Sequence, residues 1–182
     1  AQIKKMDGNF FNTDLTYSIV ADKRNQAFKP TNGYRASFFQ TLPIIQDSSH
    51  VMNGVDVASY YDFSEDVIGA FKFYAKTIHG IDDDVRLTNR LYLPKRKLRG
   101  FDVYKVGPKD GDDYIGGNYA SAITAEAQLP NILPESYRTD ISVFFDAANL
   151  WEVDYSGSLD DTNKIRSFSS SNCLTDSFPI AL

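Results

Sequence analysis

The side chains that most often catalyse reactions or bind metals are sparse in this sequence. It has one cysteine, Cys173, which excludes an internal disulfide, and two histidines, His50 and His79, whose separation fits no metal-binding motif. The acidic runs 82–84 and 110–113 lack the ligand spacing of a 12-residue calcium loop, so they predict solvated loops. No serine lies in a nucleophile motif. We therefore expect no enzyme, no cofactor and no metal site.

The polar residues of most interest lie in a long stretch, 80–116, that has no sustained hydrophobic period. A compact domain rarely carries so long an irregular segment unless that segment has a function. Three glycine-containing motifs lie in it or directly after it: Leu98-Arg99-Gly100-Phe101, Val106-Gly107-Pro108-Lys109 and Ile115-Gly116-Gly117-Asn118. An arginine can engage two carboxylates through its planar guanidinium while staying charged. Alone, however, Arg-Gly-Phe predicts only an exposed turn with a solvated arginine, so its meaning depends on the surrounding elements.

Those elements are six segments in which apolar and polar residues alternate: 11–22, 34–44, 51–63, 67–79, 117–130 and 137–151. In the last segment one parity carries no charge and has an aromatic residue at each end, Tyr137 and Trp151. Ordinary strands run about 5–6 residues, and these run about twice that. Long strands with one charge-free face and aromatic ends are typical of transmembrane β-strands.

The composition agrees with a membrane-spanning sheet, excludes a transmembrane helix and argues against nucleic-acid binding. No run approaches about 18 apolar residues, which excludes a transmembrane helix. The net charge is −5 and the basic residues are dispersed, so the sequence gives little support for nucleic-acid binding. The high aromatic content, with 13 Phe and 11 Tyr, suits the interfacial girdles of a barrel, although a soluble β-sandwich can be equally aromatic.

The expected fold is all-β: an antiparallel meander of about six long strands that forms an open, curved sheet with one long loop. Six strands cannot close a membrane barrel, whose smallest members have about 8, so we expect a transmembrane β-barrel fragment. Short and long connections are expected to alternate along the chain, as periplasmic turns and external loops do. The start, residues 1–5, does not read as a signal peptide, and we expect an internal piece of a longer protein.

The order of motifs along the chain resembles that of the outer-membrane assembly factors of the BamA type. The shared order is a long loop with Arg-Gly-Phe and Gly-Pro, Gly-Gly-Asn at a strand start, Glu and Pro near that strand's end, and Phe-Phe-Asp in the next strand. The superfamily also contains two-partner secretion transporters and the barrel-assembly proteins of mitochondria and chloroplasts. The resemblance runs from about Asn12 to Ser167. It implies a roughly 16-stranded barrel that follows periplasmic POTRA domains, with this chain supplying roughly strands eight to thirteen and the sixth external loop.

The resemblance also implies roles for single residues. Arg99 would fold back into the barrel lumen and pair with Glu126 and Asp146. The alternation agrees, because both carboxylates lie on the polar parity of consecutive antiparallel strands and therefore face the same side. Alone, Asp146 could instead be a solvated carboxylate of the lumen. The remaining expected site residues complete the loop motif or shape the turns and the strand start: Leu98, Gly100, Phe101, Gly107, Pro108, Gly116, Gly117 and Asn118.

The sequence departs from the family pattern in two places. The family has a glycine pair shortly before Arg-Gly-Phe, whereas this chain has Leu93-Pro94-Lys95-Arg96-Lys97, so the approach to the loop tip is expected to differ. The family's last strands and terminal aromatic residue are missing, and a Ser-rich tail stands there instead. We expect 1–167 to belong to the C-terminal barrel, with 80–116 as its long external loop, and 168–182 to be an atypical tail, truncated or disordered.

The function implied by the resemblance is the folding and insertion of β-barrel proteins into the bacterial outer membrane, without nucleotide or cofactor. The implied partners are outer-membrane lipid, unfolded β-barrel client proteins and the accessory lipoproteins of an assembly complex. A two-partner secretion pore of the same superfamily is the main alternative, and two rather than five upstream POTRA domains would favour it. A soluble β-sheet binding protein predicts charges on both faces of the strands. A plain porin gives no reason for the Arg-Gly-Phe loop.

Overall fold

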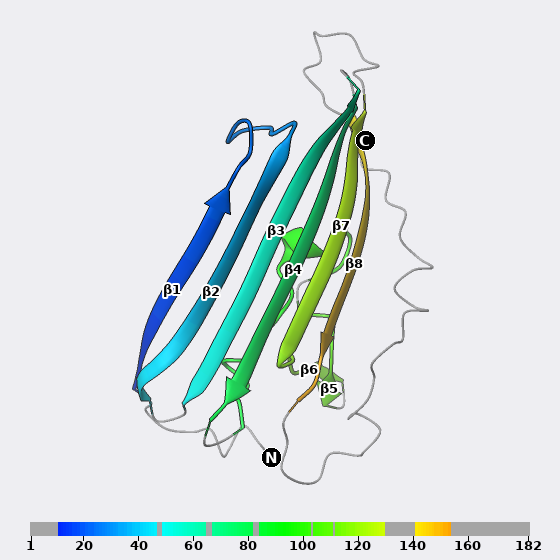
Figure 1. The fold of residues 1–182 in the computed structure, drawn as a ribbon. Helices are drawn as coiled ribbons and strands as arrows, with labels where there is room; N and C mark the ends of the chain where they lie inside the picture. The colour runs from blue at the N-terminus through cyan, green and yellow to red at the C-terminus, as the bar shows by residue number, and fades with distance from the viewer. Residues whose placement is uncertain are drawn as a thin grey trace.

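The computed structural model describes residues 11–46, 49–64, 67–81, 84–102, 104–110, 112–129 and 141–153. Six long strands form one antiparallel sheet in the order β1-β2-β3-β4-β7-β8 (Figure 1). The strands are β1 (Asn12–Asp22), β2 (Gly33–Gln46), β3 (His50–Ser64), β4 (Val67–Gly80), β7 (Tyr119–Leu129) and β8 (Ile141–Trp151). Every strand pairs with its neighbour along the chain, apart from the small hairpin between β4 and β7. The described residues therefore confirm an all-β fold with an open meander sheet.

The pairing register separates the sheet into two chemically different faces. The outer face holds the odd-numbered residues of β1, β3, β4, β7 and β8, together with residues 34 to 44 of even number in β2. None of these positions is Asp, Glu, Lys or Arg. Large apolar side chains such as Ile19, Phe71 and Phe145 are exposed on this face. A charge-free face on strands of 11 to 15 residues is typical of a surface that contacts lipid.

The inner face holds the opposite parity and carries the charged residues of the sheet. It is partly covered by the long loop, residues 81–118, which joins β4 to β7. The loop contains a 3₁₀ turn, η2 (Lys95–Lys97), and a two-stranded hairpin of β5 (Lys109–Asp110) and β6 (Asp113–Tyr114). The sequence did not predict these short elements, because two or three residues are too few to establish a hydrophobic period. In the described part of the chain, no helix is long and apolar enough to span a membrane.

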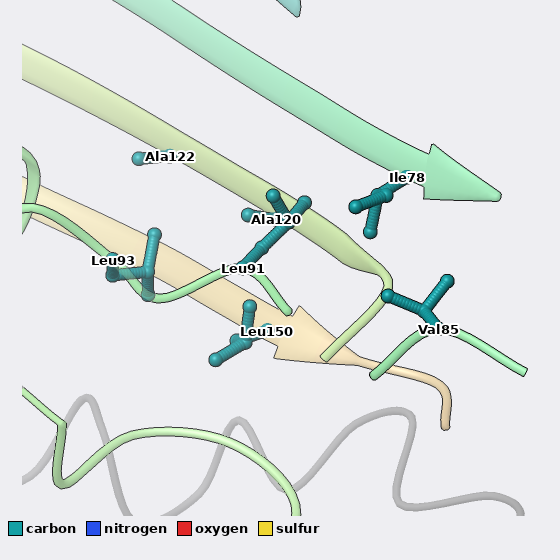
Figure 2. Close-up of a cluster of buried hydrophobic side chains, with 7 residues drawn as sticks. All are labelled: Ile78, Val85, Leu91, Leu93, Ala120, Ala122 and Leu150. Atoms are coloured by element: carbon teal, nitrogen blue, oxygen red, sulfur yellow. The ribbon is translucent and has the colours of Figure 1, made fainter. Parts of the chain in front are cut away.

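A hydrophobic core lies between the loop and one end of the sheet. Its buried members are Ile78, Val85, Leu91, Leu93, Ala120, Ala122 and Leu150. Figure 2 shows them gathered near the end of β4 and the start of β7, with the loop residue Leu91 directed toward the strand. The two small side chains on β7, Ala120 and Ala122, lie on the inner face and leave room for the leucines of the loop. The loop is thus packed on the sheet.

The strand boundaries agree with the expectation to within about two residues wherever the structure describes them. Two expectations need correction. Gly117 and Asn118 precede β7. Gly117 bridges to Leu91 of the loop, whereas the amide of Asn118 donates to the carbonyl of Trp151 on β8 and its carbonyl accepts from the amide of Ile78 on β4. The alternation of short and long connections is wrong, since the two shortest, 47–49 and 65–66, follow one another along the chain. Residues 130–140, which include the expected strand start at Tyr137, and the tail 168–182 lie outside the described residues.

Candidate functional site

Backbone hydrogen bonds join Leu91 of the long loop to Gly117, which lies just before β7. The amide of Leu91 donates to the carbonyl of Gly117 at 2.9 Å, and the amide of Gly117 donates to the carbonyl of Leu91 at 3.1 Å. The next amide, that of Asn118, donates to the carbonyl of Trp151 at 3.1 Å. A Cβ atom on Gly117 would lie 2.7 Å from the carbonyl oxygen of Trp151, so only glycine allows this approach. The Gly-Gly-Asn motif therefore builds the seam where loop and sheet meet.

Gly107 and Pro108 contribute to the same seam between loop and sheet, through contacts with Leu150 and Ile115. Gly107 has a φ of +111°, which favours glycine, and its Cβ would lie 2.6 Å from a methyl carbon of Leu150. The carbonyl of Pro108 accepts a hydrogen bond of 3.1 Å from the amide of Ile115. Buried Arg90 adds a bond from its Nε to the carbonyl of Val85, at 3.3 Å. These contacts shape the loop and place its tip.

The loop tip, residues 97–99, holds Arg99 against β7 and β8. The Nε atom of Arg99 lies 2.7 Å from Oδ2 of Asp146, and one terminal nitrogen lies 2.9 Å from Oδ1, so the pair is bidentate. The backbone amide of Arg99 donates to the same carboxylate at 3.1 Å. The other terminal nitrogen lies 3.5 Å from Oε2 of Glu126. Hydrogen bonding to Asp146 raises the pKa of Arg99 above its ordinary value, so the arginine stays charged.

The sheet register explains why both carboxylates reach one arginine. Asp146 lies opposite Thr124, and Glu126 lies opposite Phe144, so the two acids are diagonal neighbours on the inner face. The Asp146 side chain is only 3% exposed. Burial of a carboxylate is costly unless a charged partner and hydrogen bonds compensate it, and Arg99 supplies both.

Two residues that the sequence interpretation left out complete this docking site, which consists of Lys72, Arg99, Glu126, Phe144 and Asp146. The guanidinium carbon of Arg99 lies 3.4 Å from the ring centroid of Phe144, as in a cation–π contact. The ammonium of Lys72 lies 3.0 Å from Oε2 of Glu126. The site therefore holds two cations and two carboxylates. Both missed residues lie on the polar parity of their strands, and that parity was the available signal.

The structure brings together Arg99, Glu126 and Asp146, which the sequence placed in one group. The rest of the loop motif has other surroundings: Leu98 is 4% exposed, and Gly100 has a φ of +84°. Phe101 and Leu98 line the same small cavity within the loop. The glycines at 107, 116 and 117 lie at the seam and outside the docking site. Chemically, the docking site can hold the loop in place, because it pairs the arginine of the loop tip with carboxylates of the sheet.

Comparison with known proteins gives one family match. A family model described as the Omp85 superfamily domain matches residues 1–174. The outer membrane protein assembly factor BamA of Neorickettsia risticii (strain Illinois) is 27% identical over 157 residues, which are 84% of this chain and 21% of that protein. The human sorting and assembly machinery component 50 homolog is 24% identical over 164 residues, which are 84% of this chain and 34% of that protein.

A solved structure has a similar fold. The crystal structure of BamA from Haemophilus ducreyi lacking POTRA domains 1–3 matches with a TM-score of 0.68 and 23% identity, over 76% of this chain and 30% of that chain. At this identity the likeness shows the fold alone. The chain spans between about a fifth and about a third of the length of these relatives.

Proposed function

The chain belongs to the Omp85 superfamily, and from that membership we propose that it forms part of the membrane barrel of a factor that folds and inserts β-barrel proteins into the bacterial outer membrane. The observation that carries the proposal is the loop-tip Arg99, held by Asp146 and Glu126 on the inner face of a sheet whose outer face is free of charge. A sheet that only binds a soluble ligand has no need of such an outer face.

The bacterial outer membrane is the membrane we propose. Of the two relatives described, the bacterial outer membrane assembly factor has the higher identity, 27% against 24% for the human protein. In this role the outer face contacts lipid and the inner face lines the barrel lumen, which the loop enters. Unfolded β-barrel proteins are the clients, and accessory lipoproteins are the proposed partners in the complex.

The contribution of this part of the barrel is to stay folded while other parts move. The loop tip links β8 to β7 through side chains, in addition to the backbone hydrogen bonds that already join these strands. The hydrophobic core between the loop and the sheet adds buried apolar contacts. Insertion then draws on the folding free energy of the client, and no nucleotide, cofactor or covalent chemistry is required.

The proposal is tested with the full-length protein reconstituted in liposomes. A urea-unfolded β-barrel client is diluted into the suspension, and its folded fraction is followed by the heat-dependent gel mobility of folded barrels. We expect faster client folding than in empty liposomes or in liposomes that contain a porin at equal mass. Equal rates in all three would contradict an assembly role. A secretion pore would instead move an unfolded secreted partner into the protease-protected interior without accelerating the client.

A further inference from the structure

A second cation on the loop tip reaches a different part of the sheet. The ammonium of Lys97 forms an ion pair with Asp56 of β3. It also lies 4.8 Å from the ring centroid of Tyr74 on β4. Asp56 and Tyr74 lie directly opposite each other on the inner face, so together they form one receptor for the lysine. The Lys97 side chain is 17% exposed, which makes this contact less solvated than an ordinary surface ion pair.

The local backbone explains how two cations so close in sequence both reach the sheet. Pro94 precedes the 3₁₀ turn, and the amide of Lys97 closes the turn by donating to the carbonyl of Pro94 at 2.8 Å. The chain then becomes extended at Leu98, with φ −148° and ψ 94°. In extended backbone, alternate side chains point to the same side. Lys97 and Arg99 therefore both face the sheet, while Leu98 is buried within the loop.

We propose that Lys97 is a second positioning residue of the loop, which pins the loop tip to β3 and β4 while Arg99 pins it to β7 and β8. The two contacts together span four neighbouring strands, from β3 to β8. A loop held at one point can still pivot, whereas two separated points fix its orientation as well.

This role of the loop rests on the proposed function. In that function the two contacts of the loop tip, with Asp56 and with Asp146, act together as a brace across the sheet. Separation of β3 and β4 from β7 and β8 would have to break one of the two ion-pair contacts as well as backbone hydrogen bonds. We infer that the brace keeps these four strands at fixed curvature. Tyr74 supports this arrangement because it also packs against the hydrophobic core of the loop.

The test measures release of the loop tip by limited trypsin digestion of the purified full-length protein in detergent micelles. The bond between Arg99 and Gly100 is followed by mass spectrometry, because none of the variants changes either residue. Asp56→Asn removes the partner of Lys97 with little change in shape. We expect cleavage about threefold to tenfold faster than in the unmodified protein, in line with a partly buried ion pair and cleavage from the open state.

Asp62→Asn is the matched control, since Asp62 is also an inner-face carboxylate of β3 but hydrogen-bonds Asn32 instead of the loop. We expect its cleavage rate to equal that of the unmodified protein. The exchange Lys97→Asp with Asp56→Lys is expected to restore protection. Equal rates for Asp56→Asn and Asp62→Asn, or no restored protection in the exchange variant, would overturn the proposal. Loss of protection with unchanged client insertion would leave the anchor standing and count against the proposed function.

Discussion

Replacement of Arg99 by alanine is expected to release the loop tip and to remove most of the assembly activity of the full-length protein. The change leaves Asp146, whose side chain is 3% exposed, without its bidentate partner. Removal of one member of a buried ion pair typically costs about 3–5 kcal/mol, because the remaining charge is left uncompensated. Glu126 lies on the same inner face, so the repulsion between the two carboxylates adds to this cost.

The measurement is growth of cells depleted of their own assembly factor, together with the temperature at which the purified barrel loses its folded gel mobility. Lys105→Ala provides the control, since Lys105 pairs with Asp102 in the same loop but both side chains are at least 67% exposed. A solvent-exposed pair of this kind contributes little to stability, so we expect normal growth and an almost unchanged unfolding temperature. If Arg99→Ala matches Lys105→Ala in both measurements, the arginine does not hold the loop.

Ile78→Ala is expected to have the second largest effect, a loss of folding stability, because the Ile78 side chain of β4 is fully buried against the long loop. Deletion of the larger part of a buried isoleucine costs about 2–5 kcal/mol, depending on how far the cavity can collapse. The neighbouring Ala120 and Ala122 are too small to fill the space, so we expect the upper half of that range. Chemical denaturation of the refolded barrel in detergent measures the change in free energy of unfolding.

A matched variant on the same strand separates burial from strand identity. Ile68 lies on the inner face of β4 near its other end, outside the loop core, and is only partly buried. We expect Ile68→Ala to lose less than half as much free energy as Ile78→Ala. Equal losses at both positions would mean that the loop contributes nothing to the stability of the sheet at Ile78.

The strands could be predicted from the sequence because a period of two residues persists over at least 11 residues in each. The same parity assigned Glu126 and Asp146 to one face before any pairing was known, and the register places them there. The pairing of those two acids with Arg99 could not be predicted from the alternation. The alternation gave two acids on one face, and only the resemblance to a family linked them to Arg99.

The remainder of the docking site could not be predicted because it depends on tertiary contacts between segments without a common period. Lys97 reaches Asp56 across 41 residues of sequence, and no local pattern relates the two. Lys72 and Phe144 were visible as inner-face residues, but their contacts with Glu126 and Arg99 depend on where the loop tip lies. The short elements of the loop depend on the same packing, since an isolated two-residue hairpin has no stability of its own.

The most direct test of the central claim, that the arginine on the loop tip is held by the sheet and is needed for assembly, is an exchange of charges in the full-length protein. Arg99→Glu, Asp146→Arg and the double variant are compared by growth of depleted cells and by trypsin protection of the loop. We predict that each single variant fails in both measurements and that the double variant partly recovers both. Glu126 limits the recovery, because it repels the carboxylate that the exchange introduces on the loop tip. Normal growth and protection with Arg99→Glu alone would contradict the claim.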